Sequence, residues 1–140
     1  MTKSNREKVA FWIPQQLLPT LRQRDENLSE AIRESLSRYF AMLDRARHNL
    51  RGRLTDDELT AIATISNGTI FEPHTLEGIL WNLQDANEAE CLFDDTRRTE
   101  LVAKLDSMSL LEHAALVDAV ERFWRAVGTG MSVDATKILD

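Results

Sequence analysis

The residues best suited to catalysis or metal binding are few and scattered in this chain of 140 residues. Its histidines, His48, His74 and His113, form no pair at helical spacing and have no cysteine at zinc-site spacing. The runs Asp56-Asp57-Glu58 and Asp94-Asp95 fall where helices should begin, and acidic side chains there stabilise the helix dipole. Glycine-rich phosphate loops and nucleophile elbows do not occur in the sequence. We therefore expect no metal, no cofactor, no catalytic residue and no enzyme activity.

The charge of the chain is divided unevenly along its length. Residues 1–53 contain 11 Lys and Arg against 6 Asp and Glu, a net charge of +5, whereas residues 54–140 contain 6 basic and 17 acidic residues, a net charge of −11. Attraction to a polyanion depends on the local face and not on the total of −6. The first half is therefore the candidate for binding double-stranded DNA, and the acidic second half is a candidate for binding a protein partner.

Cysteine usage and the N-terminus indicate the compartment. Cys91 is the only cysteine, so no intrachain disulfide can form, which fits a reducing environment. The first nine residues, MTKSNREKV, lack the apolar region of a signal peptide. No apolar run approaches the roughly 20 residues that span a bilayer. We expect a cytoplasmic protein that makes no membrane contact.

A short strand and a helix are predicted at the N-terminus. Residues 8–13, KVAFWI, are β-branched, aromatic and β-prone, and Pro14 ends the run. A helix is expected over 15–25, and Pro19 inside it predicts a kink or a short helix because it cannot donate a backbone hydrogen bond. Three leucines fall on one face of this helix: Leu17, Leu18 and Leu21.

A longer helix should follow. Asn27 is a favourable N-cap residue, Glu30 stands at capping-box spacing from it, and the helix is expected to end near Arg47. Apolar residues recur along it at intervals of three and four, which is typical of an amphipathic helix. These residues are Leu28, Ile32, Leu36, Phe40 and Leu43.

The strand should need a second chain. A lone strand leaves both of its edges unpaired, and a unit of about 40 residues is too short to bury a core of its own. Two chains that pair their strands and interlock their helices would meet both needs. In this arrangement the first third of the sequence resembles the ribbon-helix-helix family. The shared features are the alternating strand, the proline after it, the leucine-rich first helix and the Ser-Glu-Ala-Ile-Arg-Glu-Ser-Leu run at 29–36.

The resemblance implies a homodimer, either alone or in a higher-order assembly on DNA, with the strand pair in the major groove. It further implies that the start of each second helix clamps a phosphate through free N–H groups. Lys3 and Arg6 would lie on an arm that reaches the DNA backbone. The implied DNA-facing residues of the strand are Lys8, Ala10 and Trp12, and those of the helix start are Asn27, Leu28, Ser29 and Glu30. The implied dimer core is Val9, Phe11, Ile13, Ile32, Leu36 and Phe40.

The second half should be a small all-α domain. Helices are expected over about 55–65, 75–88 and 95–106, and a fourth begins after Ser109 and ends at Gly128. The fold class is thus mostly α: one short strand and two helices per chain in a ribbon-helix-helix dimer, followed by an all-α domain. The expected divisions are a DNA-binding and dimerisation domain at 1–47, a basic linker at 48–54, an acidic helical domain at 55–127 and a flexible tail at 128–140.

Two features leave alternatives open. The sequence has a dense basic run, Arg45, Arg47, Arg51 and Arg53. This run could flank the DNA or dock against the acidic half of the protein. Trp81, Phe123 and Trp124 could form the core of the second domain or line a groove for a basic partner.

The function predicted first is a sequence-specific DNA-binding transcriptional regulator, a repressor. The alternative is a protein-interaction module, such as an antitoxin or an accessory protein of plasmid transfer or partition.

Overall fold

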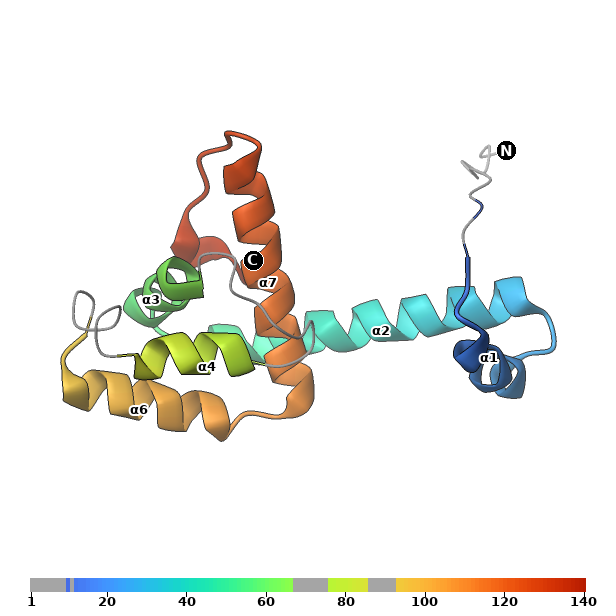
Figure 1. Ribbon diagram of the computed structural model, residues 1–140, viewed down its shortest axis with the longest axis horizontal. Helices are drawn as coiled ribbons and strands as arrows, with labels where there is room; N and C mark the ends of the chain where they lie inside the picture. The colour runs from blue at the N-terminus through green and yellow to red at the C-terminus, as the bar shows by residue number, and fades with distance from the viewer. Residues whose placement is uncertain (1–9, 11, 67–75, 86–92) are drawn as a thin grey trace. The chain divides into compact units, whose positions relative to one another are not determined.

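The computed structural model describes residues 10, 12–66, 76–85 and 93–140. In these residues the chain forms α-helices, two short 3₁₀ helices and irregular connections, and none of the described residues lies in a strand (Figure 1). The chain divides inside α2 into a first unit, Met1–Tyr39, and a second unit, Phe40–Asp140. The elements are η1 (Gln15–Leu17), α1 (Leu18–Arg24), α2 (Leu28–Arg51), α3 (Asp56–Ser66), α4 (Glu77–Gln84), α6 (Asp95–Asp106), α7 (Leu110–Gly128) and η2 (Ala135–Lys137).

The strand expected over 8–13 falls partly outside the described residues. Ala10, Trp12 and Ile13 are irregular, and residues 8, 9 and 11 are not among those described. A ribbon of this kind takes one strand from each of two chains, so one chain by itself supplies no hydrogen-bonded neighbour for the segment. The all-α part of the predicted fold class is therefore confirmed for the described residues, whereas the ribbon stays a prediction.

The two prolines set the start of α1. Pro14 precedes a single 3₁₀ turn, Gln15–Leu17, and α1 begins at Leu18 with Pro19 in its first turn. A proline there costs no hydrogen bond, because the N–H groups of a first turn have no partner inside the helix. The short helix predicted from Pro19 is confirmed, and α1 ends at Arg24.

Asn27 caps α2 as its sequence predicts. Its Oδ1 accepts the N–H of Ser29 at 3.0 Å and that of Glu30 at 3.4 Å. The other half of the expected capping box is not made: the Asn27 N–H donates to Asp25 at 2.9 Å, and the Glu30 carboxylate pairs with Arg33 at 2.8 Å. The local turn formed by Asp25 thus replaces the reciprocal bond.

The C-terminal end of α2 lies beyond the expected position. The helix continues past Arg47 to Arg51, because Leu50 is fully buried and extends the apolar stripe by another turn. The expected linker at 48–54 is therefore helical over its first four residues, and Gly52 follows in a turn.

The second unit has one apolar core. α3 packs on α4, α7 and η2, and α4 lies beside α6, while α7 runs at a steep angle to α4 and α6 (Figure 1). No helix in the described part of the chain is both long enough and apolar enough to cross a membrane. Large side chains with less than 2% exposure fill this core: Leu50, Ile62, Leu76, Ile79, Leu83, Leu101, Leu105, Leu116, Val117, Val120 and Leu139.

Two capping boxes start helices of the second unit where the sequence predicts them. Thr55 and Glu58 exchange hydrogen bonds at 2.9 and 3.2 Å before α3. Ser109 and Glu112 do so before α7, with both bonds at 3.2 Å. The bounds of α6 also agree with the expected range of 95–106. These boundaries were predictable because the residues that fix them are three positions apart in the sequence.

The C-terminal tail differs from its expectation. After Gly128 the chain turns at Gly130, whose φ is 85°, and returns to the core. Ile138 is 7% exposed and Leu139 is 1% exposed. The carbonyl of Leu139 accepts a hydrogen bond from Nε of Arg51 at 2.7 Å. The prediction of a flexible tail over 128–140 is thus wrong for its last residues, which pack as part of the core.

Candidate nucleic-acid interface

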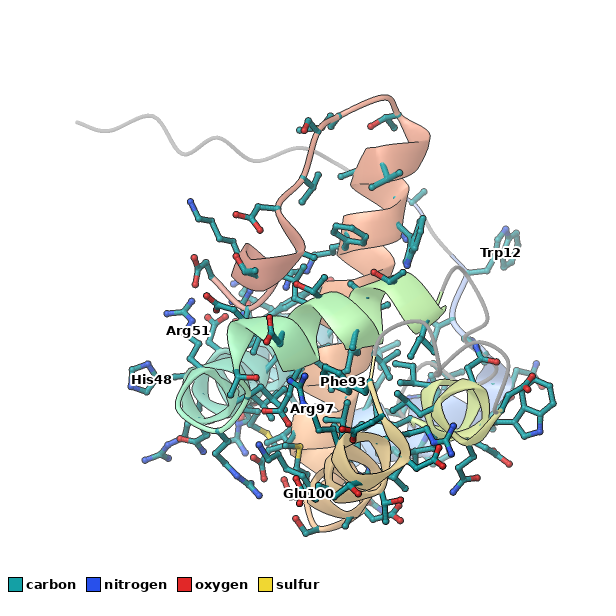
Figure 2. The ribbon with its side chains drawn as sticks, turned by 90° about the vertical axis from the view of Figure 1, so that its left-hand side faces the viewer. Trp12, His48, Arg51, Phe93, Arg97 and Glu100 are labelled. Carbon is teal, nitrogen blue, oxygen red and sulfur yellow. The ribbon has the colours of Figure 1, made fainter. Side chains whose placement is uncertain are left out.

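The segment before α1 is exposed where it is described. Trp12 has 99% of its surface exposed, and its indole stands out from the backbone (Figure 2). Ala10 is also exposed, whereas Ile13 is half-buried. The other predicted residues of the strand and of the basic arm lie outside the described residues: Lys3, Arg6, Lys8, Val9 and Phe11.

The start of α2 carries the predicted phosphate clamp. Leu28 is half-buried, and Ser29 and Glu30 are exposed. Of the three N–H groups in the clamp, those of Ser29 and Glu30 already donate to the side chain of Asn27. A phosphate at this position would have to displace that side chain. The helix start is therefore accessible, but two of its three donors are engaged.

The first unit has almost no interior of its own. Among its described residues only Ala31 is buried, with 0% exposure. Leu36 is 51% exposed, Leu17 is 49% exposed and Tyr39 is 46% exposed, while Ile32 is half-buried. A folded unit normally covers most of its large apolar side chains. Leu17 and Leu36 thus offer apolar surface to a second chain.

Phe40 is the predicted dimer-core residue that belongs to the second unit. Its side chain is 57% exposed, and that of Met42 is 50% exposed. From Leu43 onward the apolar residues of α2 are buried in the core of the second unit. The apolar stripe predicted from the sequence is thus covered in its last part only.

Four arginines in the described part of the first unit behave in two ways. Arg33 pairs with Glu30 at 2.8 Å, and Arg38 pairs with Glu34 at 2.7 Å. Arg22 and Arg24 lie exposed in the last turn of α1 and form no ion pair with the described residues of their unit. The sequence interpretation missed these two residues, although the Arg-Gln-Arg run before an acidic turn was a visible signal.

The basic run at the end of α2 docks within the second unit. Arg53 pairs with Glu112 at 2.9 Å. Arg51 donates to the Leu139 carbonyl and lies 3.5 Å from the carboxylate of Asp140. Of the two alternatives left open by the sequence, the structure supports docking against acidic groups for these two arginines. Arg47 pairs with Asp44 on the same helix. His48 extends from the exposed side of this helix (Figure 2).

No protein-family model, no curated protein and no solved structure matches this chain.

The three aromatic residues of the second half have different surroundings. Nε1 of Trp124 donates to the Ala63 carbonyl at 2.9 Å, and Phe123 packs edge-on against Trp124 with ring centroids 5.3 Å apart. Both rings are half-buried and pack against the core. Trp81 on α4 is 60% exposed. Phe123 and Trp124 therefore have a structural role, and Trp81 is the aromatic residue that remains available to a partner.

A surface hollow of about 250 Å³ lies between α3 and α6. Lys104 pairs with Glu58 across it at 2.7 Å, and the guanidinium of Arg97 lies 4.1 Å from the ring centroid of Phe93. Figure 2 shows Phe93 and Arg97 together, with Glu100 on the same helix as Arg97. No group of three or more His, Cys, Asp and Glu side chains that could hold a metal is found among the described residues. The charges of this hollow are largely balanced by one another.

Glu58 pairs with Lys104, and Glu112 pairs with Arg53 in the segment that follows α2. Burial alone would raise the pKa of Glu58, but hydrogen bonds from Lys104 and Thr55 and the charge of Lys104 outweigh it and lower the pKa below 4.5. Burial alone would also raise the pKa of Glu112. The hydrogen bonds from Ser109 and the pairing with Arg53 outweigh this effect and lower the pKa below 4.5. Lys104 also donates to the Arg53 carbonyl at 3.1 Å, directly after α2.

These lowered pKa values predict a pH dependence of stability. A carboxyl whose pKa is lower in the folded state binds protons more weakly there than in the unfolded chain. Its contribution to stability is present above the unfolded pKa, near 4.5, and is lost as the pH falls through the folded pKa. Glu58→Gln should therefore lower the free energy of unfolding by about 1.5–3 kcal/mol at pH 7, where a hydrogen bond to a charged group is lost, and by less at each step from pH 5 to pH 2.

Urea unfolding of the full chain at several pH values measures this. Glu100→Gln, a change at an exposed carboxylate beside the same hollow, is the matched control and should alter neither stability nor its pH dependence. A difference between Glu58→Gln and the unchanged protein that stays constant from pH 7 to pH 2 would contradict the assignment.

Proposed function

We propose that the protein is a homodimeric, sequence-specific DNA-binding regulator that acts as a transcriptional repressor. Its first unit pairs with that of a second copy. The strands of the two chains form a ribbon in the major groove. The first unit itself carries 7 Lys and Arg against 5 Asp and Glu, a net charge of +2, and this local excess supports contact with DNA.

The observation that carries the proposal is the missing interior of the first unit. Ala31 is the only buried side chain among its described residues, and Leu17, Leu36 and Tyr39 are each about half exposed. Apolar surface contributes about 25 cal/mol for each Å² removed from water. A second copy with the same exposed residues supplies a self-complementary apolar face, which a twofold dimer requires. Dimerisation would thus complete a core that one chain lacks.

Base reading is assigned to the outward residues of the strand. Lys8 can donate to guanine O6 and N7, and Ala10 can contact a thymine methyl group. Trp12 is 99% exposed, which supports a contact outside its own chain. Its indole offers an apolar surface to a thymine methyl or to the sugar-phosphate wall of the groove.

Selection of bound sequences from a random DNA pool tests the proposal. The full-length protein at about 150 mM salt, where plain charge attraction is weakened, should enrich a palindrome or repeated half-sites. The double variant Lys8→Ala with Trp12→Ala should lose this enrichment, because it lacks the two largest strand contacts with the bases. It should remain a dimer in sedimentation, since neither residue belongs to the proposed dimer core.

Two results would count against this assignment. Equal enrichment by the double variant would mean that the strand presents its other face to DNA. The absence of any enrichment by the unchanged protein would remove sequence-specific regulation altogether. In that case the second candidate, a protein-interaction module, gains support from the 60% exposure of Trp81 in an acidic unit, which suits a basic partner.

A further inference from the structure

The turn between α1 and α2 offers a phosphate fewer backbone donors than its sequence implies. Asn27 Oδ1 accepts the N–H groups of Ser29 and Glu30, so two donors at this helix end are engaged. The carboxylate of Asp25 accepts the N–H of Asn27 at 2.9 Å and lies in the same turn. A phosphate that approached these N–H groups would have to displace the Asn27 side chain and come close to a like charge.

Positive charge next to this turn comes from the end of α1. Arg22 and Arg24 occupy its last turn, and both are exposed. Within the described residues of the first unit they form no ion pair, whereas Arg33 and Arg38 are each held by a glutamate at 2.8 and 2.7 Å. A guanidinium on a long side chain carries its donors away from the backbone and matches the geometry of phosphate oxygens.

We propose that the side chains of Arg22 and Arg24, rather than the N–H groups at the start of α2, hold the DNA phosphates at this turn. The inference rests on the proposed DNA-binding function and names two residues that this function uses. Phosphate contacts position a protein on DNA and carry no sequence information directly. Arg22 and Arg24 therefore supply affinity for any sequence, while the strand supplies selectivity.

The dependence of DNA binding on salt tests this assignment with the full-length protein. Each phosphate contact that is lost should reduce the slope of log affinity against log salt by about 1. The double variant Arg22→Ala with Arg24→Ala removes two contacts from each chain, so the slope of a dimer should become less steep by about 4. Its affinity should fall equally for selected and random duplexes. Arg22→Lys with Arg24→Lys keeps the charges and should retain most of the slope.

Arg33→Ala with Arg38→Ala is the matched control. It removes the same net charge from the same unit, but these two arginines are already paired with Glu30 and Glu34. Its slope should stay close to that of the unchanged protein. An equal loss of slope in the control would overturn the inference, because it would show an effect of total charge rather than of two particular side chains.

Asn27→Gly tests the competing route through the backbone. Glycine is an accepted N-cap residue, and its introduction frees the N–H groups of Ser29 and Glu30. Tighter DNA binding by this variant would mean that the N–H groups hold the phosphate and would overturn the inference.

Circular dichroism and sedimentation check that each variant folds and dimerises. If the alanine variant of Arg22 and Arg24 loses helix, Arg22→Gln with Arg24→Gln replaces it in the same measurement. A wild-type slope in the folded double variant overturns this inference and leaves the proposed function intact. A wild-type protein that binds no duplex DNA overturns both.

Discussion

Leu36→Glu should convert the dimer into a monomer and abolish tight DNA binding. Leu36 is 51% exposed in a unit whose only buried described residue is Ala31. About half of each Leu36 side chain is already covered within its own chain, so the two leucines of a dimer contribute about 1.5–3 kcal/mol to association. This corresponds to roughly 10- to 100-fold in the dimer dissociation constant. The two carboxylates introduced by the substitution add a desolvation cost and repel each other across the twofold axis.

Leu110→Glu is the control for this substitution. Leu110 is a leucine of the second unit with 64% exposure, at the first position of α7, where an acidic residue is favourable to the helix dipole. Sedimentation should find Leu36→Glu monomeric at concentrations at which Leu110→Glu remains a dimer. A Leu36→Glu protein that stays dimeric would place the interface between the chains elsewhere.

Loss of DNA binding should follow from loss of the dimer. The proposed ribbon takes one strand from each chain, so a monomer has neither the ribbon nor the second half-site contact. The DNA affinity of Leu36→Glu should therefore fall with its dimerisation, and raising the protein concentration should recover both together. Recovery of the dimer without recovery of DNA binding would separate the two properties and contradict the ribbon.

The helices of this protein were largely predictable because their boundaries depend on local residues. The N-cap side chains accept hydrogen bonds from N–H groups two or three positions further on, as seen at Asn27, Thr55 and Ser109. The start of the first helical segment is fixed by Pro14 before it and Pro19 in the first turn of α1. Such signals are contained in a few consecutive residues. The bounds of α6 and the capping boxes of α3 and α7 were therefore within reach of the sequence.

The hydrogen-bond and ion-pair partners of the candidate interface residues were harder to predict, because several acceptors compete for each donor. The spacing of Asn27 and Glu30 indicates a capped helix, but it does not say that Asp25 replaces Glu30 in the box. The basic composition of 45–53 likewise does not reveal that Arg53 pairs with Glu112, a residue 59 positions away. The sequence left open whether the arginines at the end of α2 flank DNA or dock against acidic groups, and the sequence interpretation did not single out Arg22 and Arg24 in α1.

The C-terminal tail was mispredicted for a related reason. The segment from Gly128 has no apolar period, so nothing local distinguishes it from a loose end. Its burial comes from the core of the second unit, where η2 packs against α3, and from the bond between Arg51 and the Leu139 carbonyl. Ile138 and Leu139, which are adjacent in the sequence, are the buried residues of this segment.

Leu139→Ala should accordingly destabilise the second unit although it lies one residue from the C-terminus. Leu139 is 1% exposed, and removal of a buried leucine side chain typically costs about 2–5 kcal/mol, through lost burial and the cavity that remains. Substitution by alanine keeps the backbone carbonyl that accepts from Arg51, so the loss reports the side chain and not the hydrogen bond. Urea unfolding followed by circular dichroism should show a lower midpoint with an unchanged slope.

Met131→Ala separates burial in the core from any general effect of changing the tail. Met131 lies in the same C-terminal segment but is 62% exposed, so its truncation should change stability by less than about 0.5 kcal/mol. If Leu139→Ala were as mild as Met131→Ala, the tail would be loose, as the sequence alone suggests, and Arg51 would lose its anchor on the Leu139 carbonyl. Arg51 would then no longer be held inside the second unit, so the packing of Leu139 determines whether this basic group could take part in the proposed DNA binding.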